Sequence, residues 1–422
     1  MSAPTIAHSN SEIGRLLKVM IHRPDEGIAR ISPRHAEELL FDDIVYLPQM
    51  QQEHDVFTAV LRAFLPEGQV YESADLLLEA LQADDSKRQE LLELIADYED
   101  LPGVHREMLD GLSMEELRDT LITGYCTPTD HILFTPIPNF IFTRDIAATV
   151  NDHILVLKAA KEARARENYL TRYIIYAHPM FEEVRQAERV INLNHGDKFP
   201  PSRTGEMVSV EGGDVMLLHE DYLLIGSSER TSDYGIKLLT EELFRRGVVK
   251  NVAQVNIPSA RSWMHIDTLF TQINYNDIVA YGPLVVNGSS TVEVRRHNGT
   301  SKRYASIKEF IRTEINDNMR FILAGNGKSP YQEREQWTDG CNLVALRPGI
   351  GLTYDRNPHT KVAFEAAGYT VVDAEELLAQ FERGERTPDE LQDTIIALPS
   401  NELSRARGGS HCMTCPLLRD TI

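Results

Sequence analysis

Hydrophobic positions recur along the chain as pairs of short apolar segments, and four such pairs are evident. They occupy residues 146–150 and 154–158, 215–219 and 223–227, 268–273 and 278–282, and 343–347 and 350–354. Asn, Asp, Pro or Gly lies between the two segments of each pair. Because hairpins need such residues at their tight turns, the pattern predicts four β-hairpins.

A short polar signature precedes each predicted hairpin. These signatures are TRD ending at Asp145, GGD ending at Asp214, HID ending at Asp267 and DGCN ending at Asn342. The signature therefore repeats at the same place in each unit, directly before the first strand.

Helical stretches and a fifth strand extend this repeat. Amphipathic helical patterns follow the first two hairpins, at residues 161–174 and 231–247. A fifth strand-like segment lies at residues 16–24, and the C-terminal segment 406–415 is placed to complete its unit. Repeated hairpin-plus-helix units predict an α/β fold built as a closed, pseudo-symmetric assembly. The main alternative is a doubly wound parallel sheet, in which single strands rather than hairpins alternate with helices.

Closure of the assembly has a consequence for the polar signatures. Equivalent strand starts would converge near one axis, which would gather a set of polar residues around a central cleft. These residues are Asp145, Asp214, His265, Asp267, Asn342 and Cys412.

The segment at residues 73–123 differs from the rest of the chain. It is rich in Leu and charged residues with helical spacing, and Pro102 and Gly103 interrupt it. Ser113 followed by Met-Glu-Glu is typical of a helix N-terminus. We therefore expect a single domain over residues 1–422 with a helical insertion at 73–123, although ordinary surface helices of the same domain fit nearly as well.

Charge and composition restrict the classes of partner. The chain has 422 residues, with 43 Lys and Arg against 64 Asp and Glu, for a net charge of −21. This charge would repel nucleic acids and anionic membrane surfaces, whereas a small cationic substrate remains compatible.

No apolar run approaches the roughly 20 residues that span a bilayer, and no secretory signal is evident at the N-terminus. Four cysteines in so long a chain do not form a disulfide framework, so we expect a reduced, cytoplasmic protein.

Cys412 is a candidate nucleophile. Gly408 and Gly409 shortly before it allow a tight turn and close approach of a ligand. His411 and two nearby arginines supply positive potential that favours the thiolate. A single cysteine is more often structural, however, and Cys412 with Cys415 also forms a CxxC motif. A zinc site would need further ligands that the sequence lacks, and a redox motif is unusual at the end of a chain.

Other candidate groups are individually ambiguous. His265 and Asp267 would share one face of a strand, as a proton carrier beside a carboxylate or as a satisfied buried pair. Glu211 and Asp145 lie before strands, where carboxylates are usually cap or loop residues. Their recurrence favours a cleft in which several acids hold a planar cation with paired acceptors.

Taken together, these blocks resemble the arginine deiminases of the guanidino-group-modifying superfamily. The resemblance covers nearly the whole chain, and its blocks are SEIGRLLKVMIHRP, ELLFDDI, PNFIFTRD, EGGD, SSERTS, MHIDTLF, YDRNPHT and RGGSHCMTCPLLRD. It implies a fivefold pseudo-symmetric α/β propeller of ββαβ-type repeats with a helical bundle insertion. It also implies hydrolysis of L-arginine to L-citrulline and ammonia through a covalent cysteine–amidino intermediate, with no metal or other cofactor, and we expect a homo-oligomer, either a dimer or a tetramer.

The resemblance also implies roles for individual residues. The catalytic set comprises Cys412 as nucleophile, His265 as general acid and base, Glu211 as its support, and Asp145 and Asp267 as the groups that hold the guanidinium. The substrate-binding set comprises Asn139, Arg164, Arg230 and Arg407, with Arg166 as the alternative to Arg164. The chain departs from the pattern at Ile146, where many members have Pro, at His411, where Arg is frequent, and at Cys341.

Alternatives to an arginine deiminase remain within and outside the superfamily. An agmatine deiminase, a dimethylarginine hydrolase or an amidinotransferase would share the nucleophile, but agmatine lacks the carboxylate that Arg164 and Arg230 are expected to bind. An inactive arginine-binding protein would be expected to lack some of the catalytic set. A metal hydrolase built on the His and Asp residues would lose activity with chelators.

Overall fold

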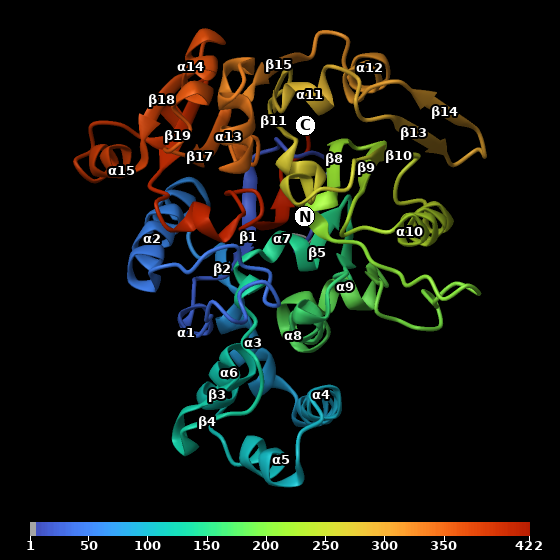
Figure 1. Ribbon diagram of the computed structural model, residues 1–422, viewed down its shortest axis with the longest axis vertical. Coiled ribbons are helices and arrows are strands. Elements are labelled where there is room, and N and C mark those ends of the chain that lie inside the picture. The colour runs from blue at the N-terminus through green and yellow to red at the C-terminus, as the bar shows by residue number, and fades with distance from the viewer. Residues whose placement is uncertain (1–5) are drawn as a thin grey trace.

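Five sheets with the same strand order form the body of the protein in the computed structural model, which describes residues 6–422 (Figure 1). In each sheet an antiparallel pair is followed by a third strand that runs parallel to the second. The triplets are β5 (Ala147–Val150), β6 (His153–Val156) and β7 (Val190–Asn192); β8 (Val215–His219), β9 (Tyr222–Ser227) and β10 (Asn251–Asn256); β11 (Phe270–Asn274), β12 (Asp277–Ala280) and β15 (Arg320–Leu323); β16 (Val344–Arg347), β17 (Ile350–Tyr354) and β19 (Thr394–Leu398); and β20 (Cys415–Arg419), β1 (Leu16–Ile21) and β2 (Val70–Glu72).

Further strands extend two of these sheets. β13 (Val292–Arg296) and β14 (Ser301–Tyr304) continue from β10, and β18 (Thr370–Asp373) lies parallel to β19. A separate small pair joins β3 (Tyr125–Cys126) to β4 (His131–Ile132).

The four predicted hairpins are confirmed, because each predicted pair of segments forms an antiparallel pair of strands. The predicted pairing between the two ends of the chain is also present. β1 and β20 are antiparallel, with Val19 opposite Pro416 and Met20 opposite Cys415. Residues almost 400 positions apart in the sequence are therefore neighbours in one sheet.

Helices make most of the connections between the parallel strands, as the geometry of a parallel crossover requires. They lie outside the sheets in Figure 1. They are α1 (Glu26–Ala29), α2 (Leu47–Phe64), α8 (Ala165–Ala177), α9 (Glu182–Gln186), α10 (Asp233–Arg246), α11 (Gly282–Val285), α12 (Ile307–Phe310), α14 (Pro358–Ala366) and α15 (Ala374–Glu382), whereas α13 (Tyr331–Trp337) joins β15 to β16 of the next sheet. The ends of α10 show why the sequence forms it there, since the Ser232 side chain caps its first turn and Gly247 ends it at φ +68°.

The segment predicted to be helical consists of α3 (Ser73–Ala83), α4 (Asp85–Tyr98), α5 (Gly103–Asp110) and α6 (Met114–Thr123). These four helices project from the sheets in Figure 1. Ser113 and Glu116 form a capping box at the start of α6, as the sequence suggested. Buried leucines of α3, α4 and α6 pack in one cluster with Leu170 and Ile174 of α8. The helical character is thus confirmed, while the division into one domain with an insertion stays a prediction.

Apolar side chains fill the space between each sheet and its helices. Phe57 and Leu61 of α2, for example, pack with Leu352 of β17 and Ile396 of β19. None of the described helices is both long enough and apolar enough to span a bilayer.

The polar signatures form short turns directly before the first strands. They include α7 (Thr143–Ile146) before β5, η5 (Gly212–Asp214) before β8 and η7 (Ile266–Thr268) before β11. Since α7 contacts η5 and η5 contacts η7, these strand starts meet, as the repeat predicted.

Candidate active site

A small cavity of about 20 Å³ lies where the strand starts meet. Its walls contain eight of the nine predicted site residues: Asn139, Asp145, Arg164, Glu211, Arg230, His265, Arg407 and Cys412. The ninth, Asp267, lies directly behind the wall, with its Oδ2 3.4 Å from Cys412 Sγ. The structure therefore brings all nine residues together, and all of them are buried.

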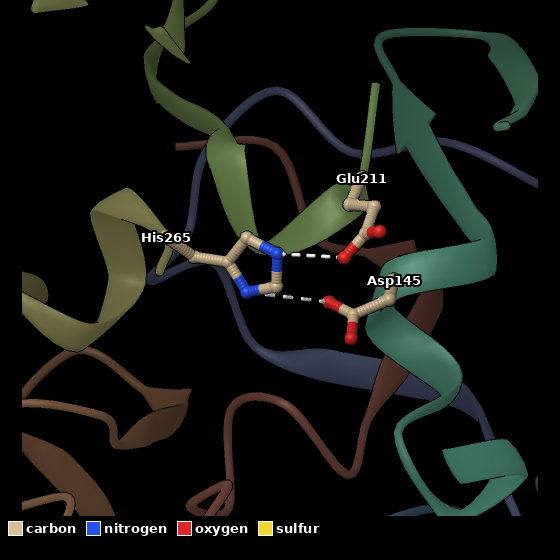
Figure 2. Close-up of side chains that lie close together, drawn as sticks. All are labelled: Asp145, Glu211 and His265. Carbon is tan, nitrogen blue, oxygen red and sulfur yellow. Dashed lines mark hydrogen bonds and ion pairs between the residues drawn. The ribbon is translucent and has the colours of Figure 1, made fainter. Parts of the chain in front are cut away.

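The two ring nitrogens of His265 face two carboxylates, Glu211 and Asp145 (Figure 2). Its Nε2 is 2.9 Å from Glu211 Oε2, and its Nδ1 is 3.8 Å from Asp145 Oδ1. Burial alone would lower the pKa of His265, but Asp145 and Glu211 raise it to about 10. Burial likewise opposes ionisation of Glu211, yet His265 and Arg164 hold the pKa of that carboxyl at about 2. The pair is therefore an imidazolium and a carboxylate at neutral pH.

Gly213 allows this close approach. A Cβ atom on Gly213 would lie 2.5 Å from His265 Nδ1, closer than any ordinary contact. The backbone N–H of Gly213 also donates to Asp145 Oδ1 over 3.2 Å. The second glycine of EGGD thus leaves room for His265 and orients Asp145 at once.

Cys412 is held by Asn342 on two sides. The Asn342 side chain donates to Cys412 Sγ over 3.1 Å and accepts from the Cys412 backbone N–H over 3.1 Å. Burial, together with the negative charges of Asp267 and Asp145, raises the pKa of the Cys412 thiol well above its usual value. The positive potential that the sequence suggested for this thiol is therefore outweighed, because the nearest charges are acidic.

Arg164 is paired with carboxylates in this conformation. Its Nη1 lies 2.6 Å from Asp145 Oδ2 and 3.5 Å from Glu211 Oε2, and its Nε donates to Glu167 Oε2 over 2.8 Å. Arg166 points away from the cavity, and its Nε donates to the carbonyl of Leu121 over 2.9 Å. Only Arg164 is thus in position to contact a ligand in the cavity.

The remaining predicted binding residues are differently engaged. Asn139 donates to the carbonyl of Leu39 over 2.8 Å. Arg230 lies 3.9 Å from Glu211, and its Nε has no hydrogen-bond acceptor among residues 6–422. The Arg407 guanidinium lies 3.2 Å from the centre of the Trp337 ring. The Nε and Nη1 of Arg407 likewise have no acceptor among residues 6–422, so both Arg230 and Arg407 keep donors free for an anionic group.

The size of the cavity limits what it holds in this conformation. A cavity of about 20 Å³ accommodates roughly one water molecule. An amino acid therefore enters only if side chains in the wall move.

Asp145, Glu211 and His265 also have the spacing of a metal site, since one ligand atom of each lies within 4.8 Å of the others. Two observations oppose this use. The pKa of His265 is raised, so a metal ion would have to displace a proton from the ring before it could bind there. Arg164 already neutralises Asp145. This arrangement instead fits a nucleophilic thiol beside a proton donor and carboxylates that accept from a planar cation.

Three further residues at this site were not among the predicted site residues, although His411 was expected to favour the thiolate. Glu12 and His411 lie behind Asp267, and Glu167 lies behind Arg164. Glu12 belongs to the SEIG block and His411 precedes Cys412, so their positions in the sequence were noticed while their contacts were not. A contact between residues 12 and 411 leaves no local signal in a sequence.

Comparison with known proteins agrees with this geometry. The arginine deiminase family model matches residues 37–129 and 113–419. An arginine deiminase of Limosilactobacillus fermentum is 32% identical, covering 98% of this chain and 99% of that protein. One of Bacillus cereus is 33% identical over the same shares.

Solved structures share the fold at low sequence identity. A Microseira wollei amidinotransferase of saxitoxin biosynthesis has a TM-score of 0.52 at 12% identity, covering 99% of this chain and 98% of that chain. The N-terminal domain of a cyanobacterial arginine dihydrolase has a TM-score of 0.51 at 12% identity, covering 96% and 98%. The fold is thus the mixed α/β fold of these enzymes, and the chain belongs to the arginine deiminase family.

Proposed function

We propose that this protein hydrolyses L-arginine to L-citrulline and ammonia, with Cys412 as the covalent nucleophile. The observation that carries the proposal is one cavity whose walls contain the Cys412 thiol, the His265 imidazolium, two acidic residues and four arginines. The family membership supports the same reaction.

In the first half-reaction the Cys412 thiolate adds to the guanidinium carbon of arginine. Asp145 and Asp267 accept hydrogen bonds from its nitrogens and hold the carbon for attack. His265, oriented by Glu211 at 2.9 Å, donates its proton to the departing nitrogen. The carbon–nitrogen bond breaks, ammonia leaves, and a thiouronium group remains on Cys412.

In the second half-reaction the neutral His265 takes a proton from a water molecule, which adds to the thiouronium carbon. Collapse of this adduct breaks the carbon–sulfur bond and returns the electron pair to Cys412 as thiolate. The remaining hydroxyl proton of the adduct passes to solvent, where the released ammonia takes it up, and the oxygen of the water becomes the ureido oxygen of citrulline.

The raised pKa of the Cys412 thiol requires the substrate to assist its ionisation. A guanidinium placed beside Asp145 and Asp267 neutralises the charges that oppose the thiolate. The incoming guanidinium also competes with Arg164 for Asp145 Oδ2, and displacement of Arg164 would free it to bind the substrate carboxylate. This exchange provides one of the movements that the small cavity requires.

The activity test compares several guanidino compounds. We expect citrulline and ammonia from L-arginine and little turnover of agmatine or methylated arginines, because Arg164 and Arg230 need an α-carboxylate partner. An added amine should not capture the amidino group, in contrast to an amidinotransferase. Turnover of agmatine without turnover of arginine would overturn the substrate assignment.

Replacement of Arg230 by alanine should chiefly weaken arginine binding. Loss of a buried charge-assisted contact to the carboxylate predicts a KM for arginine raised about 10- to 100-fold, with a smaller change in kcat. The measurement is steady-state citrulline release, with Arg245→Ala on the exposed face of α10 as the control. A KM equal to that of the wild type would remove Arg230 from the binding set.

Replacement of Gly213 by alanine tests the close packing around His265. The new methyl group would lie 2.5 Å from His265 Nδ1, so the ring must shift and kcat should fall about 100-fold. Gly103→Ala is the matched control, because nothing lies within 4 Å of a Cβ there. Full activity of Gly213→Ala would show that the placement of His265 is not critical.

Chelators separate this mechanism from a metal hydrolase. We expect activity to survive dialysis against a strong chelator, because no step above uses a metal ion. Loss of activity that added zinc or manganese restores would favour the metal hydrolase.

We also propose that the five similar sheets form a fivefold pseudo-symmetric propeller with α3–α6 as an insertion. The shared strand order and the β1–β20 pairing support this arrangement. A cytoplasmic location and a homo-oligomeric state complete the proposal, and cell fractionation and light scattering test them.

A further inference from the structure

His411 lies between two buried carboxylates. Its Nδ1 is 2.9 Å from Asp267 Oδ2, and its Nε2 is 3.2 Å from Glu12 Oε2. Each carboxylate accepts a hydrogen bond, so both ring nitrogens are placed to donate one. His411 is 2% exposed and Asp267 is fully buried, so water does not replace these contacts.

Glu12 is itself fixed by other parts of the fold. Its Oε1 accepts from the backbone N–H of Leu217 in β8 over 3.2 Å. Its Oε2 lies 3.4 Å from Nη2 of Arg144 in α7. Glu12 precedes β1, and its side chain therefore links the N-terminal segment to β8 and to α7. Because Glu12 is fixed in this way, its contact with His411 Nε2 also fixes the position of the His411 ring.

The two oxygens of Asp267 are in different situations. Oδ2 contacts both His411 and Cys412 Sγ. Oδ1 is buried, and no hydrogen-bond donor reaches it from the part of the chain that the structure describes. A buried carboxylate oxygen without a donor is costly, and the N–H group of a bound cation would satisfy it.

We propose that His411, held in place by Glu12, is a positioning residue that fixes the Asp267 carboxylate with Oδ1 free for the substrate guanidinium. The inference rests on the proposed function and extends it to two residues that do not line the cavity. His411 acts through Asp267, since its own ring nitrogens are engaged by the two carboxylates.

Two substitutions of His411 each remove a different one of its two contacts, with Asp267 or with Glu12. The side-chain amide of asparagine lies where Nδ1 of histidine lies, so His411→Asn keeps a donor to Asp267 and loses the contact with Glu12. The longer glutamine reaches the place of Nε2, so His411→Gln keeps the contact with Glu12 and loses the donor to Asp267. We expect kcat within about 5-fold of the wild type for His411→Asn and lowered about 100-fold for His411→Gln, because a misplaced binding group costs about that much.

The inhibition constant of L-norvaline distinguishes a misplaced Asp267 from a general distortion of the active site. A general distortion would change this constant, whereas a misplaced Asp267 would not. Norvaline has the amino-acid end of arginine without the guanidinium, so its inhibition constant should stay within about 2-fold in both variants. His54→Asn and His54→Gln are the matched controls, because His54 is a fully buried histidine of α2 outside the cavity wall.

If neither variant at position 411 folds, Glu12→Gln provides the test. It keeps the shape of the side chain and removes its charge, and we expect kcat to fall about 5- to 20-fold with norvaline inhibition unchanged. Equal kcat for the two variants at position 411, or a wild-type kcat for Glu12→Gln, would overturn the inference and leave the proposed function intact. A wild-type protein that releases no citrulline from arginine would overturn both.

Discussion

Cys412→Ser is expected to abolish citrulline release, with kcat lowered at least about 1,000-fold. A serine hydroxyl is far less acidic than a thiol, and the acidic surroundings that raise the pKa of the Cys412 thiol would oppose an alkoxide still more. Arginine binding should persist, because the carboxylates and arginines of the cavity are unchanged. Binding is measured by calorimetry and turnover by citrulline assay.

Cys415→Ser is the matched control for this prediction. Cys415 is also buried and lies three residues away in β20, where its Sγ is 3.3 Å from the carbonyl of Ala147. We expect the Cys415 variant to retain most of the activity. Iodoacetamide should react only slowly with the free wild type, because the Cys412 thiol stays protonated without a bound cation, and the label should be on Cys412. A Cys412→Ser protein with near-normal turnover would refute the nucleophile assignment and, with it, the covalent mechanism.

His265→Asn is expected to lower kcat about 100- to 10,000-fold, the usual range for loss of a general acid and base. The asparagine neither protonates the departing nitrogen nor activates water. His178→Asn is the control, because His178 is a buried histidine paired with Glu79 away from the cavity. Single-turnover experiments with labelled arginine measure whether ammonia release and thiouronium hydrolysis both slow. A variant that slows only one of them would contradict the use of His265 in both steps.

His265→Asn should also change how the stability of the protein depends on pH. The pKa of His265 is raised in the folded protein to about 10, so its stabilising effect is fully present below the ordinary value of 6.5 and is lost as the pH rises through about 10. Glu211 has a lowered pKa, so its contribution is present above 4.5 and is lost as the pH falls toward about 2. The difference in melting temperature between the wild type and His265→Asn should therefore be largest between about pH 5 and 6.5.

Local patterns were sufficient for much of the fold. The hairpins could be predicted because apolar segments of strand length and turn residues are features of adjacent positions. The helices at 73–123 could be predicted for the same reason, since their leucines recur at helical spacing and Ser113 marks a helix start. The pairing of the two chain ends could be predicted because four hairpin units were complete and the strand-like segment at 16–24 lacked a partner nearby in the sequence. The C-terminal segment was placed to supply that partner.

The choice between Arg164 and Arg166 needed the three-dimensional structure. Arg164 and Arg166 lie two positions apart in the same short stretch, and the sequence does not distinguish them. Side chains two positions apart in a helical turn point in different directions. Arg164 faces Asp145 in the cavity, whereas Arg166 faces Leu121 at the helical segment. The pairing of Arg164 with the very carboxylate that the substrate is expected to use was likewise invisible in the sequence.

The sequence by itself determined the four hairpins, the helices at 73–123 and the set of reactive groups, because these depend on residue type and short spacing. Only the tertiary structure decided how those groups affect one another. The high pKa of His265, the suppressed ionisation of Cys412 and the contact of Glu12 with His411 arise from charges brought together and shielded from water. Electrostatic interactions depend on the distance between the groups in space and on their burial, and neither quantity can be read from the sequence alone.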